Sequence, residues 1–116
     1  MKRKIVAISV LMLLFCSIVA FAQNSEADRL YRDARSALSE AGRVRSQALS
    51  SRDATFVLQS LNRLEGAYSQ LSRQLNNLTN RGVVISESNL REIARCSDLI
   101  ESYFYEVRNH HQRLLM

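Results

Sequence analysis

The sequence is poor in residues that cross-link a chain or force tight turns, with no proline, three glycines and two cysteines among 116 residues. Cys16 lies in an N-terminal apolar segment, so removal of that segment leaves Cys96 alone, and one thiol cannot form an internal disulfide. The fold must therefore hold without one. Cys96 lies beside the apolar seam of its expected helix, where we expect burial; the alternative is an intermolecular disulfide.

Catalytic and phosphate-binding motifs are also lacking. The sequence contains no Gly-x-Ser-x-Gly elbow, no glycine-rich phosphate loop and no His-Glu-x-x-His pattern. Acidic pairs such as Asp98 with Glu101 fall on outward helix faces, where carboxylates balance the helix dipole or pair with arginine. Narrow three-helix bundles seldom offer a substrate pocket. We therefore expect no enzymatic activity, no catalytic residue and no cofactor.

A metal site is weakly indicated near the C-terminus. Glu106 and His110 stand at i and i+4 and are able to chelate together, whereas His111 points about 100° away from His110. Cys96 is two heptads from His110, roughly 21 Å along a helix axis, and cannot share an ion with it. Two ligands make a weak site, so no metal ligand is assigned.

The N-terminus has the three parts of a secretory signal peptide. A positive stretch, Lys2 to Lys4, precedes a nearly unbroken apolar run from Ile5 to Val19, and Ala20-Phe21-Ala22 then places small residues at positions −3 and −1. We predict cleavage between Ala22 and Gln23, so that residues 1–22 are a signal peptide and residues 23–116 form a periplasmic or secreted protein.

Two alternatives to cleavage at this point stay open. Residues 5–22 are long enough to cross a bilayer, so the segment is able to serve as an uncleaved anchor and hold the protein at a membrane. Lipid attachment at Cys16 is the other, although bulky Phe15 stands where lipoprotein signals have a small residue.

Charge changes once the signal segment is removed. The segment takes both lysines and one arginine with it, leaving 13 arginines against 11 acidic residues, a net charge of +2. The arginines are spread along the chain rather than gathered on one face, which argues against a nucleic-acid partner. About 94 residues make one domain at most.

Three stretches have apolar residues at alternating spacings of three and four, the heptad pattern of packed helices. The seam of the first contains mostly small residues: Ala27, Leu30, Ala34, Ala37, Ala41, Val44 and Ala48. The second has large ones: Ala54, Val57, Leu61, Leu64, Tyr68, Leu71, Leu75 and Leu78. The third is broad: Leu90, Ile93, Ser97, Ile100, Phe104, Val107, His111 and Leu114. Gly42 and Gly66 fall on outward positions, where each costs about 1 kcal/mol relative to alanine.

Helix boundaries follow from capping residues. Ser25 is an expected N-cap, the stretch from Ser50 to Asp53 breaks the first helix and caps the second, and Gly82 ends the second in a left-handed conformation. Ser86 to Asn89 offers several N-caps for the third helix, and Asn89, with Glu92 three residues on, has capping-box spacing. The expected helices are about 25–50, 53–80 and 88–115.

These features predict an all-α protein, a signal helix followed by an antiparallel three-helix bundle. The alternative is a helical hairpin whose third helix pairs with a second copy. Tyr105 is displaced from the seam next to Arg108 and His110, and these three residues are the candidate interaction surface.

By elimination, we expect an interaction or structural module of the bacterial envelope, with a protein partner or a second copy. The alternative is a module that binds anionic envelope material through arginines, or metal through the histidines. Polyanion binding should weaken steeply as salt rises, whereas a heptad interface should persist.

Overall fold

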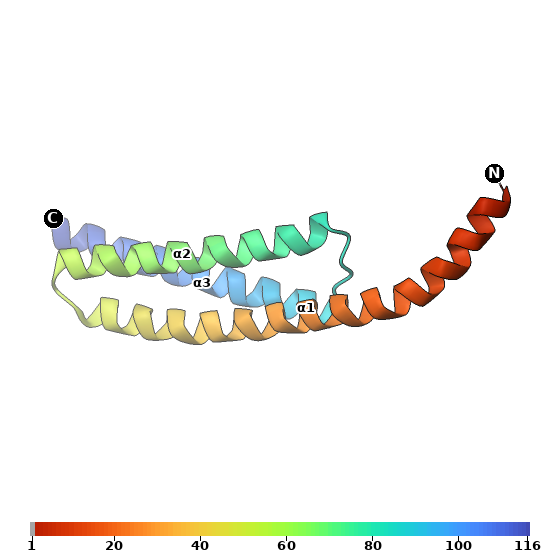
Figure 1. The fold of residues 1–116 in the computed structure, drawn as a ribbon. Coiled ribbons are helices and arrows are strands. Elements are labelled where there is room, and N and C mark those ends of the chain that lie inside the picture. Colours follow the sequence, from red (N-terminus) through yellow and green to blue (C-terminus); the bar gives the residue numbers. More distant parts are fainter. Residues whose placement is uncertain (1) are drawn as a thin grey trace.

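The computed structural model is an all-α three-helix bundle, as the periodicity predicts (Figure 1). Its helices are α1 (Lys2–Ser50), α2 (Ala54–Asn80) and α3 (Glu87–Leu115). The structure describes the backbone from Lys2 to Met116 and the side chains of residues 25–116. The predicted signal peptide and its cleavage point between Ala22 and Gln23 lie outside the residues whose side chains are described, so they stay a prediction.

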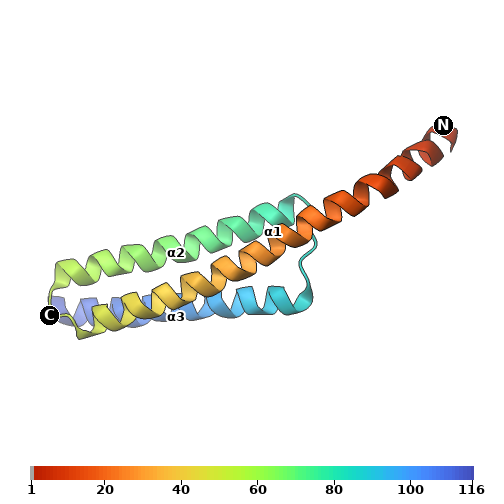
Figure 2. The same cartoon turned by 60° about the horizontal axis from the view of Figure 1, so that its bottom comes forward.

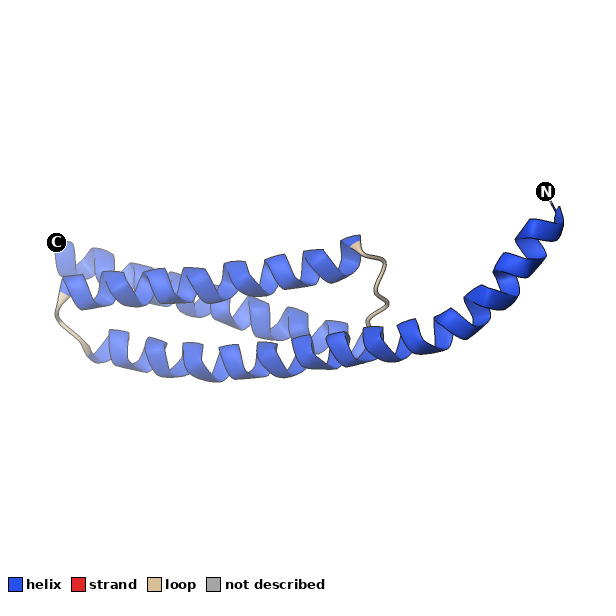
Figure 3. Ribbon diagram, viewed as in Figure 1, coloured by secondary structure: helices blue, strands red, loops and turns tan. Residues whose placement is uncertain are grey.

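Up-down-up topology places α2 antiparallel to both other helices (Figures 1 and 3). Short connections at opposite ends join the helices, and the view turned by 60° shows α1 running obliquely between α2 and α3 (Figure 2). Within residues 25–116, no helical segment combines the length and the apolar character needed to cross a membrane.

Small residues bring α1 close to the other two helices. Ala34 and Ala48 are fully buried on α1 and share one core cluster with large buried side chains such as Leu64 of α2 and Ile93 and Ile100 of α3. This pairing of small with large side chains lets the helices approach closely and fills the core. The same residues explain why the predicted α1 seam is correct at all but one position, Ala37, which is only half-buried.

The buried line of α3 differs from the predicted seam. Cys96 is fully buried and lies in line with Ile93, Ile100 and Val107, whereas Ser97 is only half-buried and Leu90 is exposed. The heptad therefore passes through Cys96 rather than Ser97, which keeps the hydroxyl of Ser97 away from the apolar centre. The expected burial of Cys96 is confirmed.

The connection between α1 and α2 forms as its sequence predicts. The Asp53 carboxylate accepts hydrogen bonds from the backbone N–H groups of Thr55 at 3.0 Å and Phe56 at 3.4 Å. These are two of the donors that a helix start leaves without an intrahelical partner, so Asp53 is the N-cap of α2.

The connection between α2 and α3 is closed by glycine. Gly82 has φ +75°, the backbone N–H of Val83 donates to the Leu78 carbonyl at 2.9 Å, and the helix ends there. Val83 enters the core while Val84 is 75% exposed, so only part of this apolar connector covers the bundle end.

Ser25 is not an N-cap in the full chain, because α1 continues on its N-terminal side. Of the several N-caps predicted between Ser86 and Asn89, Ser86 is the one that caps α3. The Ser86 hydroxyl accepts from the Asn89 backbone N–H at 3.3 Å, while the Asn89 side chain donates to Asp28 of α1 at 3.2 Å. Asn89 thus serves an inter-helix contact, and α3 begins at Glu87, whose charge suits a helix N-terminus.

Candidate interaction surface

Tyr105 of α3 presents its ring to solvent, with 47% of the residue exposed. The ring packs edge-on against Phe104, with centroids 5.6 Å apart and planes at 77°, and the Arg108 guanidinium carbon lies 5.4 Å from its centroid. Both contacts restrict the ring without covering it. Tyr105 is therefore a rigid, amphipathic side chain that remains available to a partner.

Hollows lie on both sides of Tyr105. One, of about 300 Å³, runs between α2 and α3 and is lined by Glu65, Tyr68, Glu101, Phe104 and Tyr105. The other lies along α3, and its lining includes Asp98, Glu101 and Tyr105. Tyr105 thus forms a ridge between two shallow depressions, a shape that suits contact with another protein surface better than enclosure of a small molecule.

Acidic residues surround this ridge. We call the surface formed by Glu65, Asp98, Glu101, Tyr105 and Arg108 the Tyr105 face. Within residues 25–116 its three carboxylates make no ion pair, unlike the five acidic residues that pair with arginine elsewhere in the bundle. Three carboxylates and one guanidinium give this face a net charge of −2.

His110 does not belong to the Tyr105 face. Its Nε2 lies 2.7 Å from the Ser51 carbonyl oxygen in the connection between α1 and α2, and the side chain is partly buried there. Five residues along a helix turn the direction of a side chain by about 140°, whereas the three between Tyr105 and Arg108 leave both on one side. The structure brings together two of the three predicted surface residues and uses the third to hold a loop.

Glu106 and His110, the weak chelating pair of the sequence, both contact other residues in this region. Glu106 forms an ion pair with Arg45 of α1, and His110 contacts Ser51, so neither ligand faces a shared position for an ion. In the part of the chain with described side chains, no three histidine, cysteine, aspartate or glutamate residues gather in a way that would hold a metal.

Cys96 lies far from solvent in the core. Burial raises the pKa of its thiol, and the nearby Glu92 carboxylate adds to this effect, so the unreactive thiol form is favoured. The side chain acts as a small apolar group in the α3 seam.

The opposite side of α2 carries a longer depression. We call this the α1/α2 groove; it has a volume of about 860 Å³, and its lining includes the small residues Ala37, Ala41, Ala67 and the exposed Gly66. Arg29, Asp33, Glu40, Arg63 and Arg73 line the groove as well, and an adjoining hollow extends it toward the end of α2. Glu26 and Arg81 close that end with a bidentate ion pair at 3.3 and 2.9 Å.

Neither this groove nor the contribution of α2 to the Tyr105 face was predicted from the sequence. Both depend on which helix flanks meet, and heptad spacing defines the centre of each seam but not the fit of its edges. One signal was present in the sequence. Ala67 on α2 and Ala37 on α1 are small residues at or beside seam positions, a pattern that leaves room where two such flanks lie next to one another.

No family model, no curated protein and no solved structure matches this chain. Function is therefore inferred from the residues and their geometry.

Proposed function

We propose that this chain is an exported interaction module of the bacterial envelope, which binds another protein molecule through the Tyr105 face. The observation that carries the proposal is the half-exposed Tyr105 ring, fixed by Phe104 and Arg108 and flanked by two hollows. Tyrosine and arginine are enriched among residues that dominate binding energy at protein interfaces. A ring already held in place loses little conformational entropy on binding.

Site-specific photo-crosslinking in cells tests this proposal. The full chain is expressed with a benzophenone amino acid in place of Tyr105 or, as a matched control, in place of Ser39. Ser39 is exposed on α1 and lines neither the α1/α2 groove nor the hollows beside Tyr105. The expected result is one discrete protein adduct from position 105 that position 39 does not give. No adduct, or the same adducts from both positions, would contradict the proposal.

Export is tested by a separate measurement. Intact-mass analysis of the full chain, purified from the compartment in which it accumulates, is expected to show a mass beginning at Gln23. A mass that retains residues 1–22 would favour the anchor, and an acylated mass beginning at Cys16 would favour a lipoprotein.

A second candidate function is binding of anionic envelope material, and the α1/α2 groove favours it. Arg29, Arg63 and Arg73 line the groove and make no ion pair within residues 25–116. Vesicles of phosphatidylglycerol test this candidate. Binding that falls steeply with salt and is lost in the R63E/R73E variant would support it, whereas binding unchanged in that variant would exclude the groove as the site.

A further inference from the structure

Packing within one molecule leaves the α1/α2 groove open at Gly66. A Cβ atom added to Gly66 would meet no atom within 4 Å, so no contact inside the chain requires glycine there. Glycine inside a helix is less favourable than alanine by about 1 kcal/mol. The unfavourable residue thus gives the bundle no packing advantage, but it leaves the α2 backbone accessible at the exposed edge of the groove.

The charges of the groove are opposite to those of the Tyr105 face. Arg29, Arg63 and Arg73 line the groove with Asp33 and Glu40, which gives the lining a net charge of +1. Outside the lining, Arg43 pairs with Glu40 at 2.6 Å. The Tyr105 face has a net charge of −2, so the two surfaces attract one another when they belong to different molecules.

Side-chain size also suits this contact. The groove lining includes small residues, and the Tyr105 face presents a half-exposed aromatic ring that contacts Phe104 and Arg108. The hollow between α2 and α3 shares no lining residue with the groove, so both surfaces are present on one copy at the same time.

We propose that a second copy of this chain occupies the α1/α2 groove, with its Tyr105 face directed at the small residues of the groove lining, Ala37, Gly66 and Ala67. The inference rests on the proposed function, because it names the partner of the Tyr105 face. Each copy inserts its Tyr105 face into the groove of a second copy, and its own groove receives the Tyr105 face of another. The two sides of the contact are therefore different surfaces, so the contact is heterologous. Such contacts produce chains or closed rings rather than an isolated symmetric dimer.

Light scattering on the purified product of the full chain tests the inference over a range of protein concentrations. The wild-type mass is expected to rise beyond twice the monomer mass and to fall as salt screens the opposed charges. Gly66→Gln fills the groove and is expected to hold the protein at the monomer mass. Gly42→Ala is the matched control, because it also removes a helix glycine but lies against Tyr103 on the other flank of α1, so it should assemble like the wild type.

A mixing experiment identifies the head-to-tail geometry. Tyr105→Ala keeps a groove but loses the projecting ring, and Gly66→Gln keeps the ring but loses the groove. Each variant alone is expected to be monomeric, whereas their mixture should form a one-to-one dimer through the one intact pair of surfaces. Circular dichroism of both variants verifies that the helices remain folded.

The outcomes separate this inference from the proposed function. A monomer at every concentration, assembly that survives Gly66→Gln, or a mixture that stays monomeric would overturn the inference. In that case a Tyr105 adduct with a different protein would leave the proposed function standing. An adduct at twice the monomer mass would support both, and absence of any adduct would remove the proposed function itself.

Discussion

The two flanks of α1 use small residues to opposite effect. Toward α3, Gly42 makes room for Tyr103, whose ring would lie 4.0 Å from a Cβ atom added at that glycine, so the space is filled by an aromatic side chain. Toward α2, Ala37 and Ala41 line a groove together with Gly66 and Ala67, so small residues here leave space unfilled. Small residues promote close packing only where the partner helix supplies a large one.

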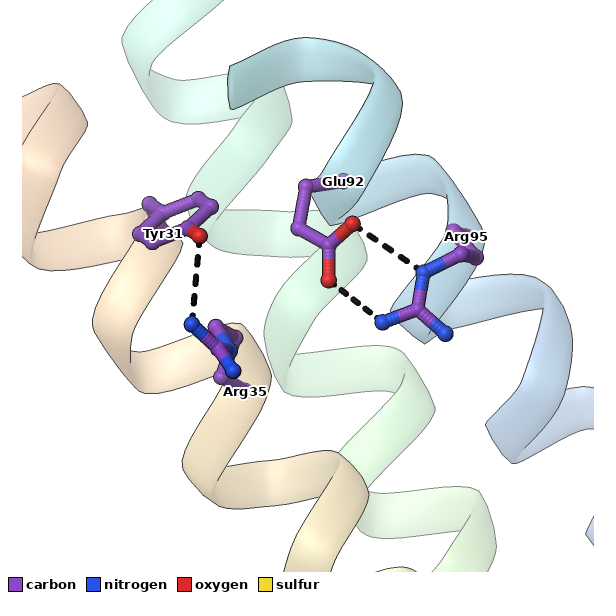
Figure 4. Close-up of polar contacts among 4 residues, drawn as sticks. All are labelled: Tyr31, Arg35, Glu92 and Arg95. Atoms are coloured by element: carbon purple, nitrogen blue, oxygen red, sulfur yellow. Dashed lines mark hydrogen bonds and ion pairs between the residues drawn. The ribbon is translucent and has the colours of Figure 1, made fainter. Parts of the chain in front are cut away.

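The polar contacts of α1 also differ between its α3 side and its α2 side. On the α3 side, the Arg45 guanidinium lies 5.2 Å from the Tyr103 ring centroid and pairs with Glu106. Nearer the start of α3, Tyr31 and Arg35 of α1 lie beside the Glu92–Arg95 pair (Figure 4). On the α2 side, the described ion pair between the helices is Glu26–Arg81 at the bundle end. We infer that α1 and α3 form the stable half of the bundle and that α2 presents the open surface.

Leucine substitutions on α1 give the largest expected contrast between filled and open space. Ala34 is fully buried, so Ala34→Leu should overpack the core and lower the free energy of unfolding by about 1–3 kcal/mol. Ala37 lies half-buried at the groove, so Ala37→Leu should cost little because its side chain enters open space. Urea denaturation measures both, and equal losses would show that the groove is as tightly packed as the core.

Arginine substitutions test the polar contacts of the two flanks. Arg45→Gln should lower the free energy of unfolding by about 1 kcal/mol, because it removes a cation–π contact together with an ion pair. Arg81→Gln removes an ion pair of similar exposure without such a ring contact, and should cost about 0.5 kcal/mol or less. A larger loss for Arg81 in thermal or urea unfolding would reverse the assignment of the stable half.

Much of this fold was predictable because the sequence encodes it locally. The helical period, a cap for α2 within the stretch from Ser50 to Asp53, and Gly82 as a helix stop each depend on a few neighbouring residues. All three predictions are correct, and the structure identifies Asp53 as the cap. The α3 seam was misplaced because Cys96 and Ser97 are neighbours of similar size, and only packing against two other helices selects Cys96 for the core.

The candidate site was predictable only in part. Exposure of Tyr105 follows from its place on α3, and the nearness of Arg108 follows from helical spacing. The contact of His110 with Ser51 and the groove beside Gly66 join residues far apart in the chain, so no local pattern reveals them. For the same reason Gly42, predicted to lie outward, is half-buried against Tyr103.

Replacing one glycine by leucine on each flank of α1 compares the α2 side and the α3 side with the same substitution. Gly66→Leu should raise the free energy of unfolding by about 0.5–1 kcal/mol, because it removes a poor helix former and adds a side chain in open space. Gly42→Leu should lose that gain. A Cβ at this position would already lie 4.0 Å from Tyr103, so the rest of the leucine side chain would collide with the ring. If thermal melts show the same gain at both positions, Tyr103 does not restrict Gly42.

The smallest expected effect is on the pH dependence of stability. It compares one glutamate from each flank of α1. Hydrogen bonds from Arg95 and Arg43 lower the pKa values of Glu92 and Glu40 respectively, and nearby arginine charges add to both shifts. A carboxyl whose pKa is lower in the folded than in the unfolded state stabilises the fold above its unfolded value, about pH 4.3, and loses that contribution as pH falls through its folded pKa. Glu92→Gln and Glu40→Gln should therefore each flatten the acid side of a melting temperature–pH curve.

The salt dependence of stability distinguishes the contributions of Glu92 and Glu40. The Glu92 side chain is 26% exposed beside α1, whereas that of Glu40 is 55% exposed at the groove rim, so ions screen the Glu40 pair more completely. In thermal melts at high salt, the difference between wild type and Glu40→Gln should vanish first, while the difference for Glu92→Gln persists. The reverse order would mean that the groove rim excludes solvent better than the α1–α3 side, and that the groove is more closed than its small residues imply.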